Sequence, residues 1–125
     1  MEITVSQAQA RVTVTILQPS GEIDSSNYQE FSDAAREALE GGGAQYLLLN
    51  LGEVTYISSA GLRAINEIFL MFRKKYPNEV SNTHEKSHRL KLLNPQVRVA
   101  EALSISGVDS FLETYNNLQG ALASY

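Results

Sequence analysis

The stretch Tyr46–Ala64, which reads YLLLNLGEVTYISSAGLRA, is the most informative part of this chain. Its first segment, Tyr46–Leu51, is apolar at nearly every position and predicts a strand covered on both faces, and the apolar character continues to Tyr56. Beyond Ser58 and Ser59, apolar residues recur at the spacing of a helix. The pattern therefore places two small hydroxyl residues where a strand passes into a helix. A hydroxyl at that place is exposed and lies at the positive end of the helix dipole.

The chain before this stretch predicts a hairpin followed by a helix. Apolar residues that alternate with polar ones indicate two half-buried strands, with Ile3 and Val5 in the first and Val12, Val14 and Ile16 in the second. We expect the polar stretch Ser6–Ala10 to join these strands and Pro19-Ser20-Gly21 to end the second. Apolar residues then have helical spacing from Tyr28 to Leu39, and Ser26 with Gln29 fits a capping box at the start of that helix.

The chain after the stretch alternates between helices and strands. The helix that begins near Ser59 is followed by a polar loop, Pro77–Arg89. Further along we expect a strand at Leu90–Leu93, a helix from Asn94-Pro95 to Ser106, a brief strand at Phe111-Leu112 and a terminal helix at Tyr115–Tyr125. This order predicts an α/β fold in one domain, residues 1–125, with a mixed β-sheet of about four to five strands and about four helices packed on it.

Composition argues against several classes of function. The chain has 125 residues, of which 43% are hydrophobic and 19% charged, as in a folded globular domain. Its net charge of −4 argues against nucleic acid as a direct partner, because phosphate binding needs a basic face. No apolar run reaches the length of about 18–20 residues that membrane insertion requires. The N-terminus lacks the pattern of a signal peptide, and no cysteine is present for disulfide or thiolate chemistry, so we expect a cytoplasmic protein.

Several short motifs resemble those of one protein family. They are Gly21-Glu22-Ile23-Asp24, Leu48-Leu49-Asn50-Leu51, Tyr56-Ile57-Ser58-Ser59-Ala60-Gly61-Leu62-Arg63, Leu92-Leu93-Asn94-Pro95 and Ser106-Gly107-Val108. Together with the order of elements they resemble a STAS domain, the family of bacterial anti-sigma factor antagonists, over essentially the whole chain. The serine–glycine motif is the most specific of them. The resemblance implies a single STAS-like domain.

What the resemblance implies about function centres on one serine. In that family a serine at the start of the second helix is phosphorylated by an anti-sigma factor that is also a serine protein kinase. The unphosphorylated antagonist binds this kinase, which then releases its sigma factor, and a serine phosphatase resets the cycle. Alignment on Gly61-Leu62 places the phosphoacceptor at Ser59, with Ser58 as the alternative. The resemblance thus implies a non-enzymatic switch, a monomer or weak dimer, without catalytic residues, cofactor or metal.

The resemblance also implies a partner-binding surface around this serine, made of Asp24, Ser58, Ser59, Gly61, Leu62 and Arg63. In this alignment Asp24 resembles the acidic residue that lies beside the phosphosite. Each position also has a purely structural interpretation, since the serines and Asp24 can cap a helix, Gly61 can meet a backbone requirement, Leu62 can belong to the core and Arg63 can be a solvated charge. Two positions depart from the family pattern: Ser58 stands where many members have an aspartate, and Ala60 where a second hydroxyl is common.

Two other hypotheses stay open at this point. The first is a STAS-like adaptor that is never phosphorylated and serves as a subunit of a larger complex, such as a lipid-transport or stress-sensing assembly. The apolar excess on the helix after Ser59, at Ile68, Leu70 and Met71, favours it. The second is an enzyme, for which His84-Glu85-Lys86-Ser87-His88 has the letters of the zinc-protease motif H-E-x-x-H. Because that motif needs a stable helix and a third ligand, we expect a solvated loop there instead.

Overall fold

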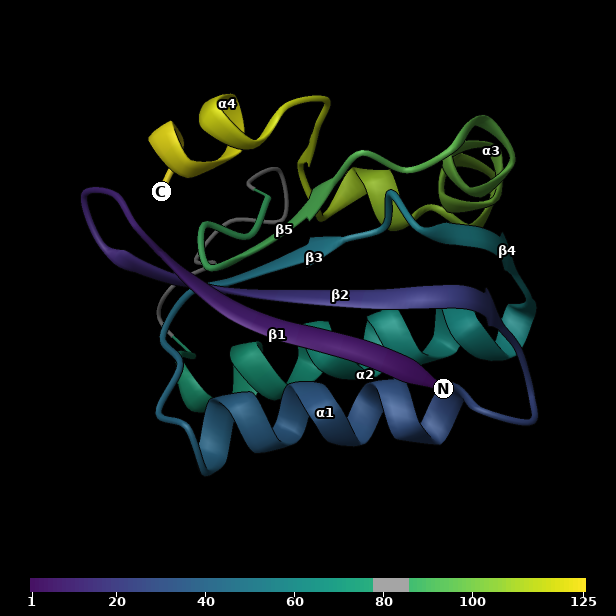
Figure 1. The fold of residues 1–125 in the computed structure, drawn as a ribbon, viewed down its shortest axis with the longest axis horizontal. Coiled ribbons are helices and arrows are strands. Elements are labelled where there is room, and N and C mark those ends of the chain that lie inside the picture. Colours follow the sequence, from purple (N-terminus) through teal and green to yellow (C-terminus); the bar gives the residue numbers. More distant parts are fainter. Residues whose placement is uncertain (78–85) are drawn as a thin grey trace.

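The computed structural model describes residues 1–77 and 86–125 (Figure 1). Within these ranges the strands form one mixed sheet of six, in the order β1-β2-β3-β5-β6, with β4 paired to β2 as well. The strands are β1 Glu2–Gln9, β2 Thr13–Ile23, β3 Leu47–Asn50, β4 Val54–Ile57, β5 Leu90–Leu93 and β6 Thr114–Tyr115. β1 and β2 are antiparallel, and every other pair is parallel.

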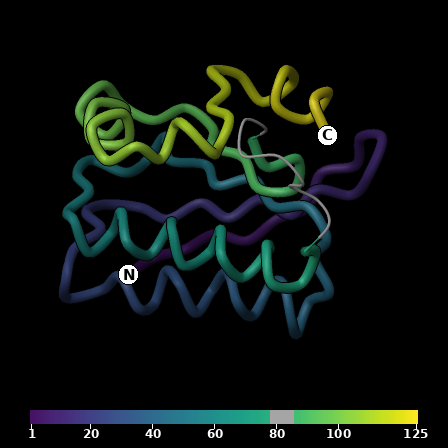
Figure 2. The backbone as a smooth tube through the Cα atoms, turned by 180° about the vertical axis from the view of Figure 1, so that it is seen from behind, coloured from purple at the N-terminus to yellow at the C-terminus, as the bar shows by residue number. Residues whose placement is uncertain are grey.

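The helices of the described ranges cover both faces of this sheet. They are α1 Tyr28–Glu40, α2 Ser59–Lys75, α3 Val97–Ser106 and α4 Leu118–Ala123, and a 3-10 turn, η1, spans Val108–Ser110. Figures 1 and 2 show α1 and α2 side by side on one face and α4 on the opposite face. α3 packs beside β4 and η1 and meets the start of α2. The predicted α/β class, with a mixed sheet and four helices, is confirmed.

Strand β3 is buried on both faces, as its uninterrupted apolar sequence predicts. Leu47 and Leu49 belong to the larger core, which α1 and α2 cover, whereas Leu48 belongs to a smaller cluster on the opposite face. Successive side chains of a strand point to opposite faces, so a strand covered twice must be apolar throughout. The smaller cluster consists of Val14, Leu48, Leu93, Ala121 and Tyr125, and α4 closes it.

The strand predicted at Tyr46–Leu51 is β3, Leu47–Asn50, and the apolar residues that continue to Tyr56 form a separate strand, β4. A turn separates them, in which the Asn50 side chain accepts a hydrogen bond from the Gly52 N–H at 3.0 Å. Both strands pair with β2, which is long enough for both. Its residues Thr15–Leu17 pair with β3, and its residues Gly21–Ile23 pair with β4. A register shift at Gly21, whose φ is +89°, lies where the second pairing begins.

The hairpin is confirmed, but its strands are longer than predicted. Ser6–Gln9, expected in the connection, pairs with β2 without interruption. Pro19, expected to end the second strand, lies inside β2, in the gap between its pairings with β3 and β4. Because β2 has no parallel partner at that point, the missing N–H of proline costs no hydrogen bond there.

One predicted helix cap and one predicted helix start are wrong, because nearby polar groups bind elsewhere. α1 begins at Tyr28 after Asn27, without the Ser26–Gln29 capping box. The Ser26 hydroxyl donates instead to the Asp24 carboxylate, at 2.5 Å. α3 begins at Val97 rather than at Asn94-Pro95, because the Asn94 N–H donates to the Tyr115 carbonyl at 2.8 Å and so extends the sheet.

The C-terminal segment also differs in detail from the prediction. The last strand is Thr114–Tyr115, not Phe111-Leu112, and α4 is confined to Leu118–Ala123. Phe111 instead packs its ring against Phe69 of α2, with 4.6 Å between the ring centroids. An apolar pair in a short segment does not distinguish a strand from a loop that contributes to the core.

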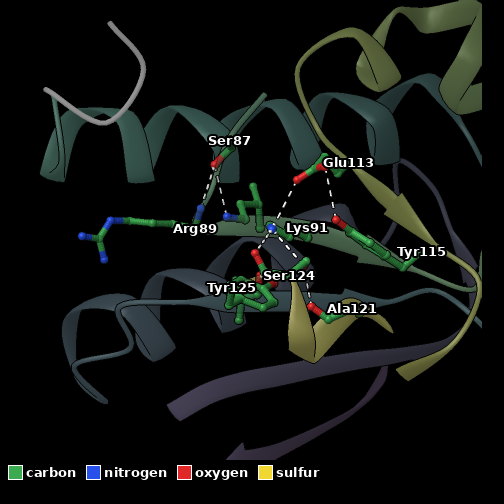
Figure 3. A network of polar contacts seen from close by, with 10 residues as sticks. Ser87, Arg89, Lys91, Glu113, Tyr115, Ala121, Ser124 and Tyr125 are labelled. Carbon is green, nitrogen blue, oxygen red and sulfur yellow. Dashed lines mark hydrogen bonds and ion pairs between the residues drawn. The ribbon is translucent and has the colours of Figure 1, made fainter. Parts of the chain in front are cut away.

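A buried lysine attaches α4 to the sheet (Figure 3). Lys91 of β5 is 1% exposed, and its ammonium group donates to the carbonyl and the hydroxyl of Ser124, at 3.0 and 2.9 Å. A Glu113 carboxylate oxygen lies 3.2 Å from the same nitrogen and balances its charge. The Tyr125 hydroxyl donates to the Leu47 carbonyl at 2.6 Å, and burial raises the pKa of this phenol, so it remains a protonated donor.

Replacement of Lys91 by methionine should therefore loosen α4. The Lys91→Met variant leaves two partly buried oxygens of Ser124 without their donor, so we expect the free energy of unfolding to fall by about 1–3 kcal/mol. Urea unfolding measures this loss. Relative to the parent protein, the rate of amide exchange should increase most in residues 118–123. Lys74→Met is the control, because Lys74 is exposed and its loss should change stability by less than about 0.5 kcal/mol. Equal stability and exchange in the two variants would contradict the role given to Lys91.

Candidate functional site

The candidate site is formed where β2 and β4 end and α2 begins. Ile23 and Ile57 are opposite each other in the last pair of these parallel strands. The next residues, Asp24 and Ser58, therefore leave the sheet side by side, and the Ser58 N–H donates to the Ile23 carbonyl at 2.9 Å. This pairing brings together two segments that are far apart in the sequence. The predicted proximity of Asp24 to the serines thus has a direct structural basis.

The structure gives the two serines different roles. Ser58 is the N-cap of α2, and its hydroxyl oxygen accepts a hydrogen bond from the Gly61 N–H at 3.3 Å. Ser59 is the first residue of the helix and is exposed, and within the described residues its hydroxyl makes no hydrogen bond. The capping interpretation of the sequence thus applies to Ser58, and the accessible hydroxyl belongs to Ser59.

Gly61 lies where only glycine fits. A Cβ atom at this position would be 2.6 Å from a side-chain carbon of Ile57 and 3.0 Å from the Ile23 carbonyl oxygen. The first turn of α2 therefore packs directly on the ends of β2 and β4. Gly61 is buried, and its lack of a side chain allows the close approach that positions Ser59, while its part in partner binding stays a prediction.

Asp24 is held in place as a carboxylate. One of its oxygens accepts hydrogen bonds from the Ser26 hydroxyl, at 2.5 Å, and from the Ser26 N–H, at 2.9 Å. These two bonds, the hydroxyl bond foremost, lower the pKa of Asp24 below the value of an ordinary aspartate. The site therefore carries a fixed negative charge at neutral pH.

A shallow groove runs from Ser59 toward α3. It has a volume of about 420 Å³ and is lined by Ser59, Leu62, Arg63, Asn66, Ser106, Val108 and Phe111. Leu62 is half-buried against the core and Arg63 is exposed, so the structural interpretation of Leu62 and the surface position of Arg63 both hold. Ile105 of α3, which precedes the groove residue Ser106 in the chain, is 88% exposed.

Sequence analysis missed the residues that α3 and η1 contribute to this groove. Ser106 at the end of α3 and Val108 of η1 are far from Ser59 in the sequence, and only the packing of α3 beside β4 and α2 brings them there.

The described residues of the H-E-x-x-H segment do not line this groove. His84 and Glu85 lie outside the described residues, and His88 is exposed, with its ring edge-on to Tyr46 at 6.2 Å between centroids. Among the residues that the structure describes, no three histidine, aspartate or glutamate side chains gather as metal ligands. In the same ranges, no helix has the length and apolarity needed to cross a membrane.

Comparison with known proteins gives the class of this chain. The STAS domain model matches residues 6–76, more than half of the sequence, and the chain belongs to the STAS domain family. No curated protein sequence matches it at a significant level.

Solved structures of low sequence identity share the fold. An anti-sigma factor antagonist from Mycobacterium paratuberculosis is 19% identical, with a TM-score of 0.74 over 98% of this chain and 93% of that one. The Bacillus cell-fate determinant SpoIIAA in its phosphorylated form is 13% identical, with a TM-score of 0.66 over 96% of each chain. A murine anion transporter, solute carrier 26 member A9, is 16% identical, with a TM-score of 0.64 over 86% of this chain but only 17% of its own. The fold thus occurs both as a separate chain and as a small part of a much larger one.

The close packing around Gly61 can be tested by adding one methyl group. Alanine favours a helix over glycine by about 1 kcal/mol, so Gly61→Ala should stabilise the protein unless its Cβ collides with the strands. We expect the collision to dominate and the free energy of unfolding to fall by about 1–3 kcal/mol. Chemical denaturation measures the sign of this change in the free energy of unfolding. A variant more stable than the parent would contradict the close packing around Gly61.

The state of Asp24 can be tested by titration. Its pKa, followed by carboxyl-detected NMR, should lie below about 3.9, the ordinary aspartate value. Since this pKa is lower in the folded protein, the stabilisation is present above the unfolded pKa and is lost as pH falls through the folded one. Ser26→Ala should raise the Asp24 pKa, whereas Ser25→Ala, at an exposed neighbour, should leave it unchanged. An Asp24 pKa that does not respond to Ser26→Ala would contradict the assignment.

Proposed function

We propose that this protein is an anti-sigma factor antagonist controlled by phosphorylation of Ser59. In its unphosphorylated form it binds an anti-sigma factor that is also a serine protein kinase, which then releases its sigma factor in the cytoplasm. Phosphorylation by that kinase ends the interaction, and a serine phosphatase restores it. The observation that carries the proposal is the difference between the serines: Ser58 is occupied as the helix cap, while Ser59 offers an exposed hydroxyl beside it.

The helix start can accept a phosphate without unfolding. A phosphoserine adds about −1.5 to −2 charges. At the first residue of α2 this charge lies at the positive end of the helix dipole, near N–H groups that have no partner within the helix. We therefore expect the fold to survive modification, so that the change affects binding rather than stability.

The same charge should prevent a partner from binding. The Asp24 carboxylate already occupies the neighbouring strand end, so phosphorylation of Ser59 concentrates negative charge on one small surface. A partner that packs against this surface would have to desolvate the phosphate and oppose its charge. A loss of about 3 kcal/mol weakens binding by more than a hundredfold.

The partner surface would extend from Ser59 into the groove toward α3. Leu62 and Phe111 give this groove apolar walls, and Arg63 also lines it. An apolar centre with a charged rim is the usual composition of a protein interface. Asp24, Ser58 and Arg63 would then make polar contacts with the partner around the unmodified Ser59.

The first test is site-resolved mass spectrometry of the protein from its own cells, in resting and stressed growth. A phosphate at Ser59 whose occupancy changes with condition is the expected result. Phosphate at Ser58 alone would move the switch to the capping residue, and no phosphate in either state would overturn the proposal.

Binding to the co-purified kinase then tests the mechanism. Ser59→Asp should weaken binding at least tenfold, whereas Ser59→Ala should bind like the parent and resist phosphorylation. Asn116→Asp is the matched control, because it adds one negative charge at an exposed position between β6 and α4, on another part of the molecule. Equal affinities for all three variants would contradict the switch.

A constitutive adaptor is the second candidate function. Leu70 of α2 is 48% exposed, and with Met71 it lines a shallow apolar area between α1 and α2, away from Ser59. The fold also forms 17% of a transporter chain, which shows that it can serve within a larger protein. A stable complex lost in Leu70→Lys but unchanged in Ser59→Asp would support the adaptor and not the switch.

A further inference from the structure

The outer edge of β1 is an unusual feature that the proposed switch does not use. β1 pairs with β2 through eight consecutive residue pairs and occupies the end of the sheet. No other strand within the described ranges pairs with its free side. Every second residue of such a strand points its N–H and C=O outward, so this edge presents a row of unpaired backbone groups.

The protections that usually blunt an edge strand are missing here. Natural edges are short, bulged, or interrupted by proline or lysine. β1 has eight residues in unbroken register, contains neither residue type, and carries a single charge, on Glu2. The opposite end of the sheet differs, because β6 has only two residues. In the described structure, β1 is thus the long edge left open for pairing.

Its side chains contribute little to the core of this chain. Six of the eight are exposed, and Val5, at the middle of the strand, is 57% exposed. Figures 1 and 2 show the hairpin of β1 and β2 extending beyond the helices at its tip. The free backbone groups of this long, exposed and nearly uncharged strand are left to solvent, and another strand can pair with them.

We infer that β1 is a self-association surface, and that its partner is β1 of a second copy of this chain, antiparallel across a two-fold axis at Val5. This register places Val5 against its counterpart, Thr4 against Ser6, and Glu2 against Ala8, so no like charges face each other. The numbers of two paired residues differ by an even number. A residue whose N–H and C=O point to the free side of β1 therefore pairs with another residue whose N–H and C=O do the same. Self-complementarity of this kind is what a two-fold interface requires. The sheet then continues through both copies.

This surface is independent of the proposed switch. Ser59 lies at the start of α2, beside the ends of β2 and β4, whereas the pairing uses the free side of β1. Ser59→Asp should therefore associate like the parent protein. A failure of self-association leaves the phosphorylation proposal untouched, and the reverse is also true.

The test is sedimentation of the full chain from micromolar to near-millimolar concentration. The parent protein should form dimers at the upper end of this range. Val5→Lys, which opposes two lysines across the axis, should raise the dimer dissociation constant by about tenfold or more. Val97→Lys is the matched control, because Val97 is 74% exposed on α3, and it should associate like the parent. A parent protein that stays monomeric, or a Val5→Lys variant that dimerises as well as the control, would overturn the inference.

A charge-swap experiment distinguishes an effect of the Val5 substitutions on the interface from an effect on folding. Val5→Lys and Val5→Glu should each be monomeric, and an equimolar mixture should form a one-to-one dimer, because lysine then opposes glutamate. In the parent dimer, the outward-facing amides of β1 should exchange more slowly at high than at low concentration, at every second residue. A mixture that stays monomeric, or β1 amides whose exchange does not change with concentration, would also overturn it.

Discussion

The close contact between the first turn of α2 and the ends of β2 and β4 is the constraint on which the candidate site depends. Because Gly61 has no side chain, the helix can start directly on Ile23 and Ile57. The Ser58 N–H then reaches the Ile23 carbonyl, and the Ser58 hydroxyl caps the helix. Once these bonds are made, Ser59 has no place in the interior, and its hydroxyl is presented to solvent beside Asp24.

Strand β2 makes this arrangement possible by pairing in two sections. Its middle pairs with β3 and its end with β4, so one long strand supports both the core and the site. The gap between the sections contains Pro19, and the second section begins at the irregularity at Gly21. Pro19 thus lies where β2 pairs only with β1 and has no parallel partner, and the strand can continue to Ile23.

The two faces of the sheet are covered by different helices and support different parts of the structure. α1 and α2 cover the face whose core also supports the start of α2. On the other face a small cluster is closed by α4, which Lys91 and Tyr125 attach through buried hydrogen bonds. A buried lysine is tolerated there because Glu113 and Ser124 satisfy it. The site and this polar network therefore lie on separate parts of the molecule.

The sequence by itself determined the alternation of strands and helices, the burial of β3 on both faces, and the position of the two serines at the start of a helix. These are local properties, since hydrophobic periodicity and the residues at turns report on nearby chain. Only the tertiary structure decided that Ser58 is the cap and Ser59 the exposed hydroxyl, because that depends on Ile23, a residue of another strand. It also decided that Ser26 binds Asp24 instead of capping α1, that α3 and η1 complete the groove, and that β1 keeps an open edge. Some of these features depend on contacts between segments far apart in the chain, and others on competition between nearby hydrogen-bond partners. The pattern of residues along the sequence contains no information on either.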